Sequence, residues 1–309
     1  MVTTGSVNEE HQRMIAGPTA SRLRETWGYL RWFYWPFGSM SARDIYELVS
    51  TNAFSNDGLY LNLGYWKDAA TIDEACQGMA RLLAETAGFG PDDTVLDVGF
   101  GFGDQDMFWA ATYGVRIVGL NITPSQVETA RRRVMERGLA DRIELLEASA
   151  TDMPLEPASV DKVVGLECAF HFDTRERFFH EAFRVLRPGG RMALADVVPN
   201  APLPGGLARR VQRMNWNTFS KKYSVPAANA DSHDAYRAKL ESAGFRDVRI
   251  ESIRHHVYPG LHAYMKRDPR MLARFHPLAR FPYKMTLFFS PEHVYSAYDY
   301  ILVSAEKPA

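Results

Sequence analysis

The sequence is poor in cysteine and lacks any spacing typical of a metal site or a disulfide framework. Its 309 residues include only two cysteines, Cys76 and Cys168, and no CxxC or paired Cys/His motif accompanies them. Structural zinc sites and small disulfide scaffolds both need such clusters. We therefore expect no metal and no disulfide, and this cysteine usage fits the reducing cytoplasm.

The sequence also lacks a long apolar run and an excess of charge of either sign. Its polar start has no hydrophobic segment typical of a signal peptide, and no run long enough to span a membrane follows. The 36 basic and 37 acidic residues give a net charge of −1. Because nucleic acids and anionic membranes attract basic surfaces, we expect neither as a partner. The 46% hydrophobic content suffices for a soluble domain with a sizeable core.

From residue 94 onward, short apolar segments alternate with segments of helical periodicity. This alternation is typical of an α/β fold with a doubly wound, mainly parallel sheet. We therefore expect a Rossmann-like, seven-stranded sheet. The expected strands are Thr94–Val98, Arg116–Leu120, Ile143–Glu147, Val160–Leu166, Arg191–Val197, Val248–Ile253 and Tyr298–Ala305.

Three segments depart from this alternation. Residues 1–88 are expected to form a helical N-terminal cap that follows a loose tail, and residues 89–309 the Rossmann-like domain. Within that domain, 199–232 and 258–293 look like lid insertions, the first rich in proline and the second in aromatic residues. The aromatic run 27–37 has helical spacing and ends at Pro36 and Gly38. Such a helix packs on the body or on another subunit, and we expect a homo-oligomer because an exposed aromatic helix would leave a large apolar patch.

A glycine-rich turn follows the first expected strand. Asp97 lies in that strand, and Gly99, Gly101 and Gly103 form a GxGxG pattern after it. A strand, a glycine turn and a helix start bring backbone N–H groups to one point and let a ligand approach closely. NAD(P) enzymes and plain tight turns share this pattern. A carboxylate at Asp97 would repel a pyrophosphate, but it can accept a hydrogen bond from the amino-acid end of S-adenosylmethionine (SAM).

Further candidate cofactor residues follow the second and third strands. They are Asn121, Ile122 and Gln126, and Ala150, Thr151 and Asp152. The Asp152 carboxylate can accept a hydrogen bond from an adenine amino group. Where dinucleotide and SAM folds favour an acid for the ribose hydroxyls, this chain has Asn121, whose amide can both donate and accept.

These motifs together resemble those of class I SAM-dependent methyltransferases over most of residues 90–200. The motifs are VLDVGFGFG, VGLNITPSQ, ASATDMP and RVLRPGGRMALADV. More narrowly, the chain resembles the macrolide-sugar O-methyltransferase group of the erythromycin pathway. That similarity rests on LYLNLGYWKD, DVGFGFGDQDMFW, ECAFHFDTRERFFHEAF and YDYILVSAEKPA. The resemblance implies SAM as cofactor, S-adenosylhomocysteine as product and a small-molecule acceptor, and it favours Tyr65 as a residue that closes over the methionine end of SAM.

The fourth strand ends in polar residues that suit methyl transfer. His171 is the candidate general base, because imidazole titrates near neutral pH; it can instead line the pocket or hydrogen-bond a loop. Glu167 can orient the base, contact the cofactor or stabilise the sulfonium; it can instead bond backbone amides. Asp196, at the end of the fifth strand, is expected to be structural.

We expect O-methylation of a hydroxyl on a secondary metabolite, such as a macrolide or glycoside. The alternative is C-methylation of a prenyl chain or alkene through a carbocation, which the aromatic clusters at 27–37 and 281–300 could stabilise. A non-catalytic SAM-binding subunit and an NAD(P)-dependent oxidoreductase remain as readings from other classes.

Overall fold

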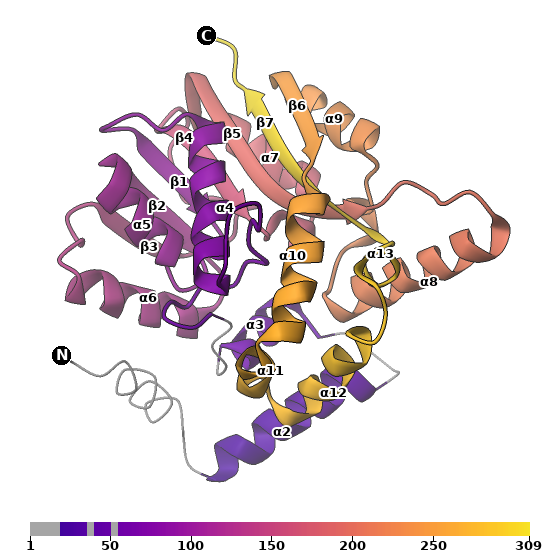
Figure 1. Ribbon diagram of the computed structural model, residues 1–309. Helices are drawn as coiled ribbons and strands as arrows, with labels where there is room; N and C mark the ends of the chain where they lie inside the picture. The colour runs from indigo at the N-terminus through magenta and orange to yellow at the C-terminus, as the bar shows by residue number, and fades with distance from the viewer. Residues whose placement is uncertain (1–18, 36–39, 51–54) are drawn as a thin grey trace.

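A seven-stranded sheet forms the centre of the molecule and confirms the expected α/β fold (Figure 1). The computed structural model describes residues 19–35, 40–50 and 55–309, so the expected tail up to residue 18 and the helix stop at Pro36 and Gly38 lie outside the described residues. The strands are β1 Thr94–Val98, β2 Arg116–Asn121, β3 Ile143–Glu147, β4 Val160–Leu166, β5 Leu186–Pro199, β6 Arg246–Ser252 and β7 Tyr298–Glu306.

The first strand, β1, lies in the interior of the sheet, and later strands are added on both sides of it. The order is β3-β2-β1-β4-β5-β7-β6, and only β7 runs antiparallel to its neighbours among these strands. The chain winds outward from β1 to β3 and then returns to β4 on the other side of β1. This reversal between β1 and β4 is the point at which doubly wound sheets bind ligands, beyond the carboxyl ends of the strands.

The fifth strand is longer than the sequence suggested. We expected Arg191–Val197, but β5 begins at Leu186 and ends at Pro199. Leu186 pairs with Val160 of β4, and β7 pairs with β5 from Arg191 to Pro199. Between these pairs, Gly189 and Gly190 bond to the backbone of Lys307, just after β7, and this extends the strand through the Pro–Gly–Gly segment, which local propensity assigns to a turn.

Helices cover both faces of the sheet and gather at one end of it. Helix α4 (Ile72–Ala87) begins with a capping box between Thr71 and Glu74 and ends at Gly88 in the left-handed conformation, as its sequence signals predict. The remaining helices are α2 Thr19–Tyr34, α3 Ala42–Val49, α5 Asp104–Tyr113, α6 Pro124–Glu136, α7 Arg175–Val185, α8 Gly206–Lys222, α9 His233–Ser242, α10 Arg254–Arg267, α11 Pro269–Arg274, α12 Pro277–Thr286 and α13 Pro291–Val294, with 3-10 turns η1 Ala169–His171 and η2 Ala227–Asn229.

Both expected lid segments are helical. Figure 1 shows α8 and α10 to α13 near α2 and α3, beyond the carboxyl ends of the parallel strands. The aromatic helix α2 packs on this group: the Trp32 ring meets Tyr223 edge-on, and Tyr29 stacks on His276 with ring centroids 4.2 Å apart. The sequence left open whether this helix packs on the body of the chain or on another subunit. For the inner face of α2, packing on the body is confirmed.

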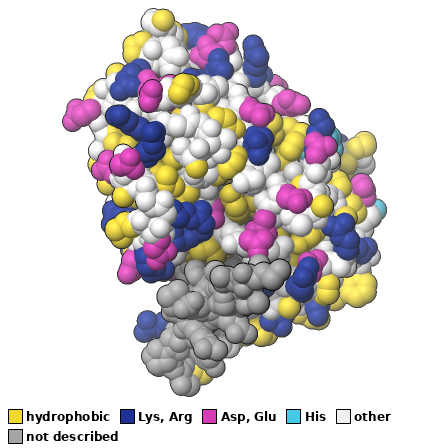
Figure 2. All heavy atoms as spheres, turned by 60° about the vertical axis from the view of Figure 1, so that its left-hand side comes forward, with side chains coloured by type: hydrophobic (Ala, Val, Ile, Leu, Met, Phe, Trp, Pro, Cys, Tyr) yellow, Lys and Arg dark blue, Asp and Glu magenta, His cyan; other side chains and the backbone are white. Residues whose placement is uncertain are grey.

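The surface carries mixed charge, as the near-zero net charge implies. Figure 2 shows basic and acidic side chains interspersed over the face that it presents. Within the described part of the chain, no helix is both long enough and apolar enough to cross a lipid bilayer. Cys76 and Cys168 are both buried free thiols.

We expect Gly260→Ala to lower the free energy of unfolding by about 1–3 kcal/mol, because a Cβ there would overpack a filled site. That atom would lie 2.2 Å from Cβ of Trp66, whereas a Cβ at Gly206 would meet nothing within 4 Å. Gly206→Ala is the matched helical control and should be neutral or slightly stabilising. Urea denaturation measures both variants, and equal midpoints would contradict the packing argument.

Candidate active site

A cavity of about 230 Å³ lies at the carboxyl ends of β1, β2 and β4, where the strand order reverses. Of the expected site residues, Gly99, Gly101, Asn121, Ile122, Gln126, Ala150, Thr151, Glu167 and His171 line it. The remaining expected residues, Asp97, Gly103, Asp152 and Tyr65, do not line this cavity. The sequence therefore predicted most of one wall, from four separate strand ends.

The glycine turn forms the floor of the cavity because only glycine fits there. Gly99 and Gly101 have φ of 77° and 58°, and a Cβ on Gly99 would lie 2.6 Å from Cβ of Cys168. Gly103, with φ of 77°, is the N-cap of α5 and shapes the turn from outside the cavity. The turn is thus a cradle that a side chain would fill.

Asp97 lies directly behind this turn. It is fully buried, and its Oδ2 accepts a hydrogen bond from Nε2 of Gln105, which itself lines the cavity, at 3.1 Å. The Asp97 carboxyl also faces that of Asp106, and the two share a side-chain hydrogen bond. Burial raises the pKa of Asp97 to about 7, while the hydrogen bonds from Asp106 and Gln105 oppose the rise, and burial together with the Asp97 charge raises the pKa of Asp106. A buried carboxyl pair behind the cradle fits the ammonium group of a SAM-like ligand, whose positive charge would favour the ionised form.

The end of β2 is held by an amide network. Asn121 Nδ2 donates to Oε1 of Gln126 at 2.9 Å, and Asn121 Oδ1 accepts from the backbone N–H of Thr123. Gln126 Nε2 donates in turn to the Ser50 hydroxyl at 3.0 Å. These amides face the cavity, so they can exchange hydrogen bonds with ribose hydroxyls in place of an acid.

Glu167 stands at the end of β4 in a strained backbone conformation. Its φ is +53°, a region that residues other than glycine rarely adopt. Its Oε1 accepts two hydrogen bonds of 2.7 Å, from the backbone N–H of Leu63 and from the hydroxyl of Tyr300. Burial raises its pKa to about 7, and these two hydrogen bonds oppose the rise. The expectation that Glu167 binds a backbone amide is confirmed, and its side chain still borders the cavity.

His171 closes the three-residue turn η1 on the same wall. Its Nε2 lies 2.9 Å from the hydroxyl of Tyr46, which belongs to α3. Its Nδ1 is buried with no hydrogen-bond partner of normal geometry in the described ranges. Burial lowers the pKa of His171 to about 4, so the imidazole is neutral at physiological pH.

Two expected residues have other surroundings. Asp152 is exposed and follows the cavity wall rather than forming it. Tyr65 meets the His256 ring edge-on, at 5.2 Å between centroids, and its backbone N–H bonds to the carbonyl of Ala75. No described aromatic residue of 27–37 or 281–300 lines the cavity. Asp196 is buried in an ion pair with Arg175, which confirms its expected structural role.

Sequence reasoning missed the cavity residues that come from outside the strand ends. Tyr46 approaches from α3, Asn62 from the loop before α4, and Gln105 from the first turn of α5. Only Gln105 had a usable signal, its place directly after the glycine turn. Nor do three or more His, Cys, Asp or Glu side chains meet as a metal site anywhere in 19–35, 40–50 or 55–309.

The Rossmann-like sheet, the glycine cradle and the buried acid behind it define a SAM-dependent methyltransferase. The comparisons with known proteins bear this out and exclude the NAD(P) reading. The profile of the mycolic acid cyclopropane synthetase family matches residues 52–277, and the chain belongs to this family.

Several similar relatives are natural-product methyltransferases. The chain is 38% identical over 242 residues to erythromycin 3''-O-methyltransferase of Saccharopolyspora erythraea. This alignment covers 77% of this chain and 79% of the relative. It is 32% identical to 27-O-demethylrifamycin SV methyltransferase of Amycolatopsis mediterranei, over 65% of this chain and 72% of the relative.

Solved structures share the fold. The [4+2]-cyclase SpnF superposes with a TM-score of 0.67 at 20% identity, covering 88% of this chain and 99% of that one. Geranyl diphosphate C-methyltransferase of Streptomyces coelicolor A3(2) superposes with a TM-score of 0.62 at 19% identity, covering 77% of this chain and 81% of that one. At these identities the likeness concerns the fold alone.

We expect Gly99→Ala to weaken binding of S-adenosylhomocysteine by at least about tenfold, since the new methyl group would fill the cradle and displace Cys168. Gly114→Ala is the control, because Gly114 also has positive φ, 71°, but a Cβ there would meet nothing within 4 Å. Both changes strain the backbone by about 1–2 kcal/mol. Isothermal titration calorimetry reports the affinities, and equal weakening by both variants would show that backbone strain, not the cradle, is responsible.

Proposed function

We propose that this methyltransferase transfers the methyl group of SAM to a hydroxyl of a small natural product, with His171 as the general base. The named relatives that act on erythromycin and rifamycin intermediates support this acceptor class. The observation that carries the proposal is a neutral, largely desolvated imidazole on the wall of the cofactor cavity. Such a group can accept the proton that a hydroxyl loses on methylation.

The residues around His171 suit this role. The hydroxyl of Tyr46, on α3, forms a hydrogen bond with Nε2 of His171. An acceptor hydroxyl would bond to Nε2 in its place or beside it. When bound, SAM supplies an electrophilic methyl group on a sulfonium centre. Glu167 borders the same cavity and holds the Leu63 amide, so that it orders the loop before α4, and its carboxylate would favour a cationic ligand.

C-methylation through a carbocation has less support from the aromatic runs 27–37 and 281–300 on which that alternative rested, although Tyr46, Phe100, Phe102 and Phe172 line the cavity. It requires aromatic faces around the reacting carbon. The aromatic residues of α2 and α12 instead pack on one another: Phe33 and Phe275 both meet the Tyr283 ring edge-on.

We also propose that the outer face of α2 contacts a second copy of the chain. Leu23 and Trp27 are 72% and 60% exposed, and Leu30 and Tyr34 continue their stripe at helical spacing. The division of the chain at residue 88 likewise stays a prediction. Sedimentation of the intact chain tests the assembly, and a single monomeric species would exclude it.

We expect His171→Ala to lower kcat by about 10² or more, because proton removal then falls to water. A panel of hydroxyl-bearing macrolides and glycosides, with ¹³C-methyl SAM, serves as substrate. Mass spectrometry counts the methyl groups, and a methoxy carbon shift in the NMR spectrum identifies O-methylation; an aliphatic shift would establish C-methylation instead. His180→Ala, at an exposed position on α7, is the control and should keep full activity. Normal turnover of His171→Ala would refute the base.

The pH dependence of kcat separates His171 from the two carboxyl groups of the site. Loss of neutral His171 should produce an acid limb near pH 4 rather than near its ordinary value of 6.5, because burial disfavours the imidazolium. The pKa values of Glu167 and Asp97 are both raised to about 7, so their protonation should produce limbs at higher pH, which a bound cation would shift downward. Glu167→Gln and Asp97→Asn should each remove one of these limbs and leave the limb near pH 4. A limb at pH 6.5 that persists in the double variant would contradict the low pKa of His171.

A further inference from the structure

The turn that carries His171 is held by side chains on both sides of it. Asp196, at the end of β5, accepts a hydrogen bond from the backbone N–H of Phe170 at 3.1 Å. Asn229, in the segment between α8 and α9, donates from Nδ2 to the carbonyl of Phe170 at 3.1 Å and to that of Phe172 at 2.7 Å. The backbone groups before and after His171 therefore bond to residues from other elements.

Asn229 uses the whole hydrogen-bonding capacity of its side chain in these contacts. Its two amide hydrogens serve the carbonyls of Phe170 and Phe172, and its Oδ1 accepts from the backbone N–H of Arg175 at 2.9 Å. The side chain is fully buried, yet it does not line the cofactor cavity. A buried amide bonded to three backbone groups fixes their relative positions.

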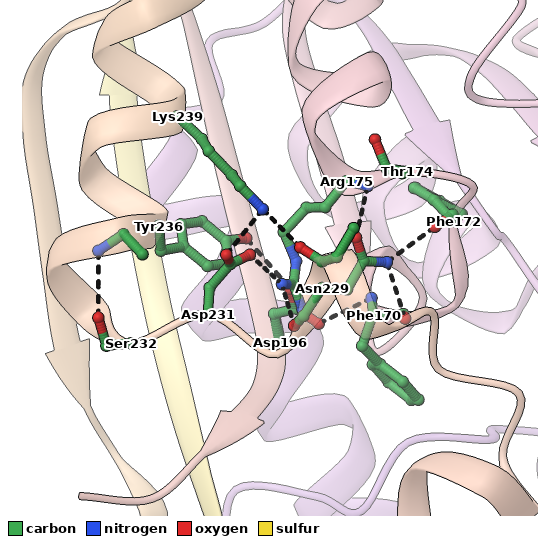
Figure 3. A network of polar contacts seen from close by, with 12 residues as sticks. Phe170, Phe172, Thr174, Arg175, Asp196, Asn229, Asp231, Ser232, Tyr236 and Lys239 are labelled. Atoms are coloured by element: carbon green, nitrogen blue, oxygen red, sulfur yellow. Dashed lines mark hydrogen bonds and ion pairs between the residues drawn. The ribbon is translucent and has the colours of Figure 1, made fainter.

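A buried charge network holds Asn229 in place (Figure 3). Nη1 of Arg175 donates to the carbonyl of Asn229 and to Asp231, both at 2.7 Å. Nε of Arg175 pairs with Asp196 at 2.9 Å, and Lys239 pairs with Asp231 at 2.7 Å. Two cations thus balance two carboxylates. The network joins β5, α7 and α9 behind the His171 turn.

The same segment also reaches the imidazole itself. Tyr223 follows α8, and its backbone contacts His171 and raises the pKa of the imidazole against the effect of burial. The chain between α8 and α9 therefore touches the ring of His171 at one end and its supporting backbone, through Asn229, at the other. Asn229 itself does not border the cavity.

We infer that Asn229 is a positioning residue that sets the orientation of His171 by bridging the backbone on both sides of it. The inference rests on the proposed role of His171 as base. Asn229 acts through the turn and touches neither cofactor nor acceptor. It also couples the lid segment to the base, since a displacement of residues 223–231 moves the His171 turn with it.

Asn229→Asp is the principal test, because the carboxylate keeps the shape and the acceptor for Arg175 but cannot donate to the two carbonyls. We expect kcat to fall on the order of 10- to 100-fold, as for a misplaced reactive group, with affinity for S-adenosylhomocysteine unchanged within about twofold. Asn217→Asp, at an exposed position of α8, makes the same chemical change and should be silent. Thermal denaturation checks folding, and Asn229→Ser replaces Asn229→Asp if the latter does not fold.

A double-mutant cycle with His171→Ala separates this inference from the proposed function. If Asn229 acts through His171, Asn229→Asp should lower kcat much less in the His171→Ala background than in the wild type. An equal loss in both backgrounds, or a wild-type kcat for folded Asn229→Asp, would overturn the positioning role. Normal turnover of His171→Ala alone would instead overturn the base.

Discussion

The buried ion pair between Arg175 and Asp196 is the constraint on which the candidate site depends. Both side chains are fully buried, and Nε and Oδ2 lie 2.9 Å apart. Such a pair contributes little net stability, but removing one partner costs about 3–5 kcal/mol because the other charge remains buried. Asp196 is also bonded by the Phe170 N–H and the Tyr236 hydroxyl. The pair therefore fixes the C-terminal part of β5, the start of α7 and the η1 turn that precedes α7 as one rigid unit.

The side of the cavity at the glycine turn and the side at His171 are held in place in different ways. On the cofactor side, the cradle at Gly99 follows from local backbone conformation and is completed by hydrogen bonds to Leu120 and Asn121 of the adjacent β2. On the His171 side, the polar groups are positioned by remote segments: Tyr46 comes from α3, and Glu167 holds the loop at Leu63. Helix α3 and the loop at Leu63 therefore help to set the positions of His171 and Glu167, the groups proposed to act on the acceptor and the cofactor. A single fold can keep one cofactor and change acceptors by changing these segments.

The same difference explains how much the sequence could predict. Strand β1 and the glycine turn at Gly99 follow from neighbouring residues, and both were predicted correctly. The placement of Asp152 and Tyr65 in the cavity was not recovered, because periodicity gives the element of a residue but not the direction of its side chain in a loop. Tyr46 carried no signal at all, since its place depends on how α3 packs across the sheet. Similarly, β5 exceeded its expected length because β4 and β7 pair with it.

The weak basicity of His171 constrains the proposed reaction. Burial holds its pKa at about 4, whereas the pKa of water, a guide to an alcohol, is about 15.7. The imidazole cannot remove the hydroxyl proton before methyl transfer, because that step would be uphill by about 12 pKa units. The proton must leave while the new C–O bond forms, when the oxygen becomes a strong acid and even a weak base accepts from it. In such a step the alignment of His171 with the acceptor oxygen matters more than its basicity, so the proposed reaction also depends on the groups that fix its turn.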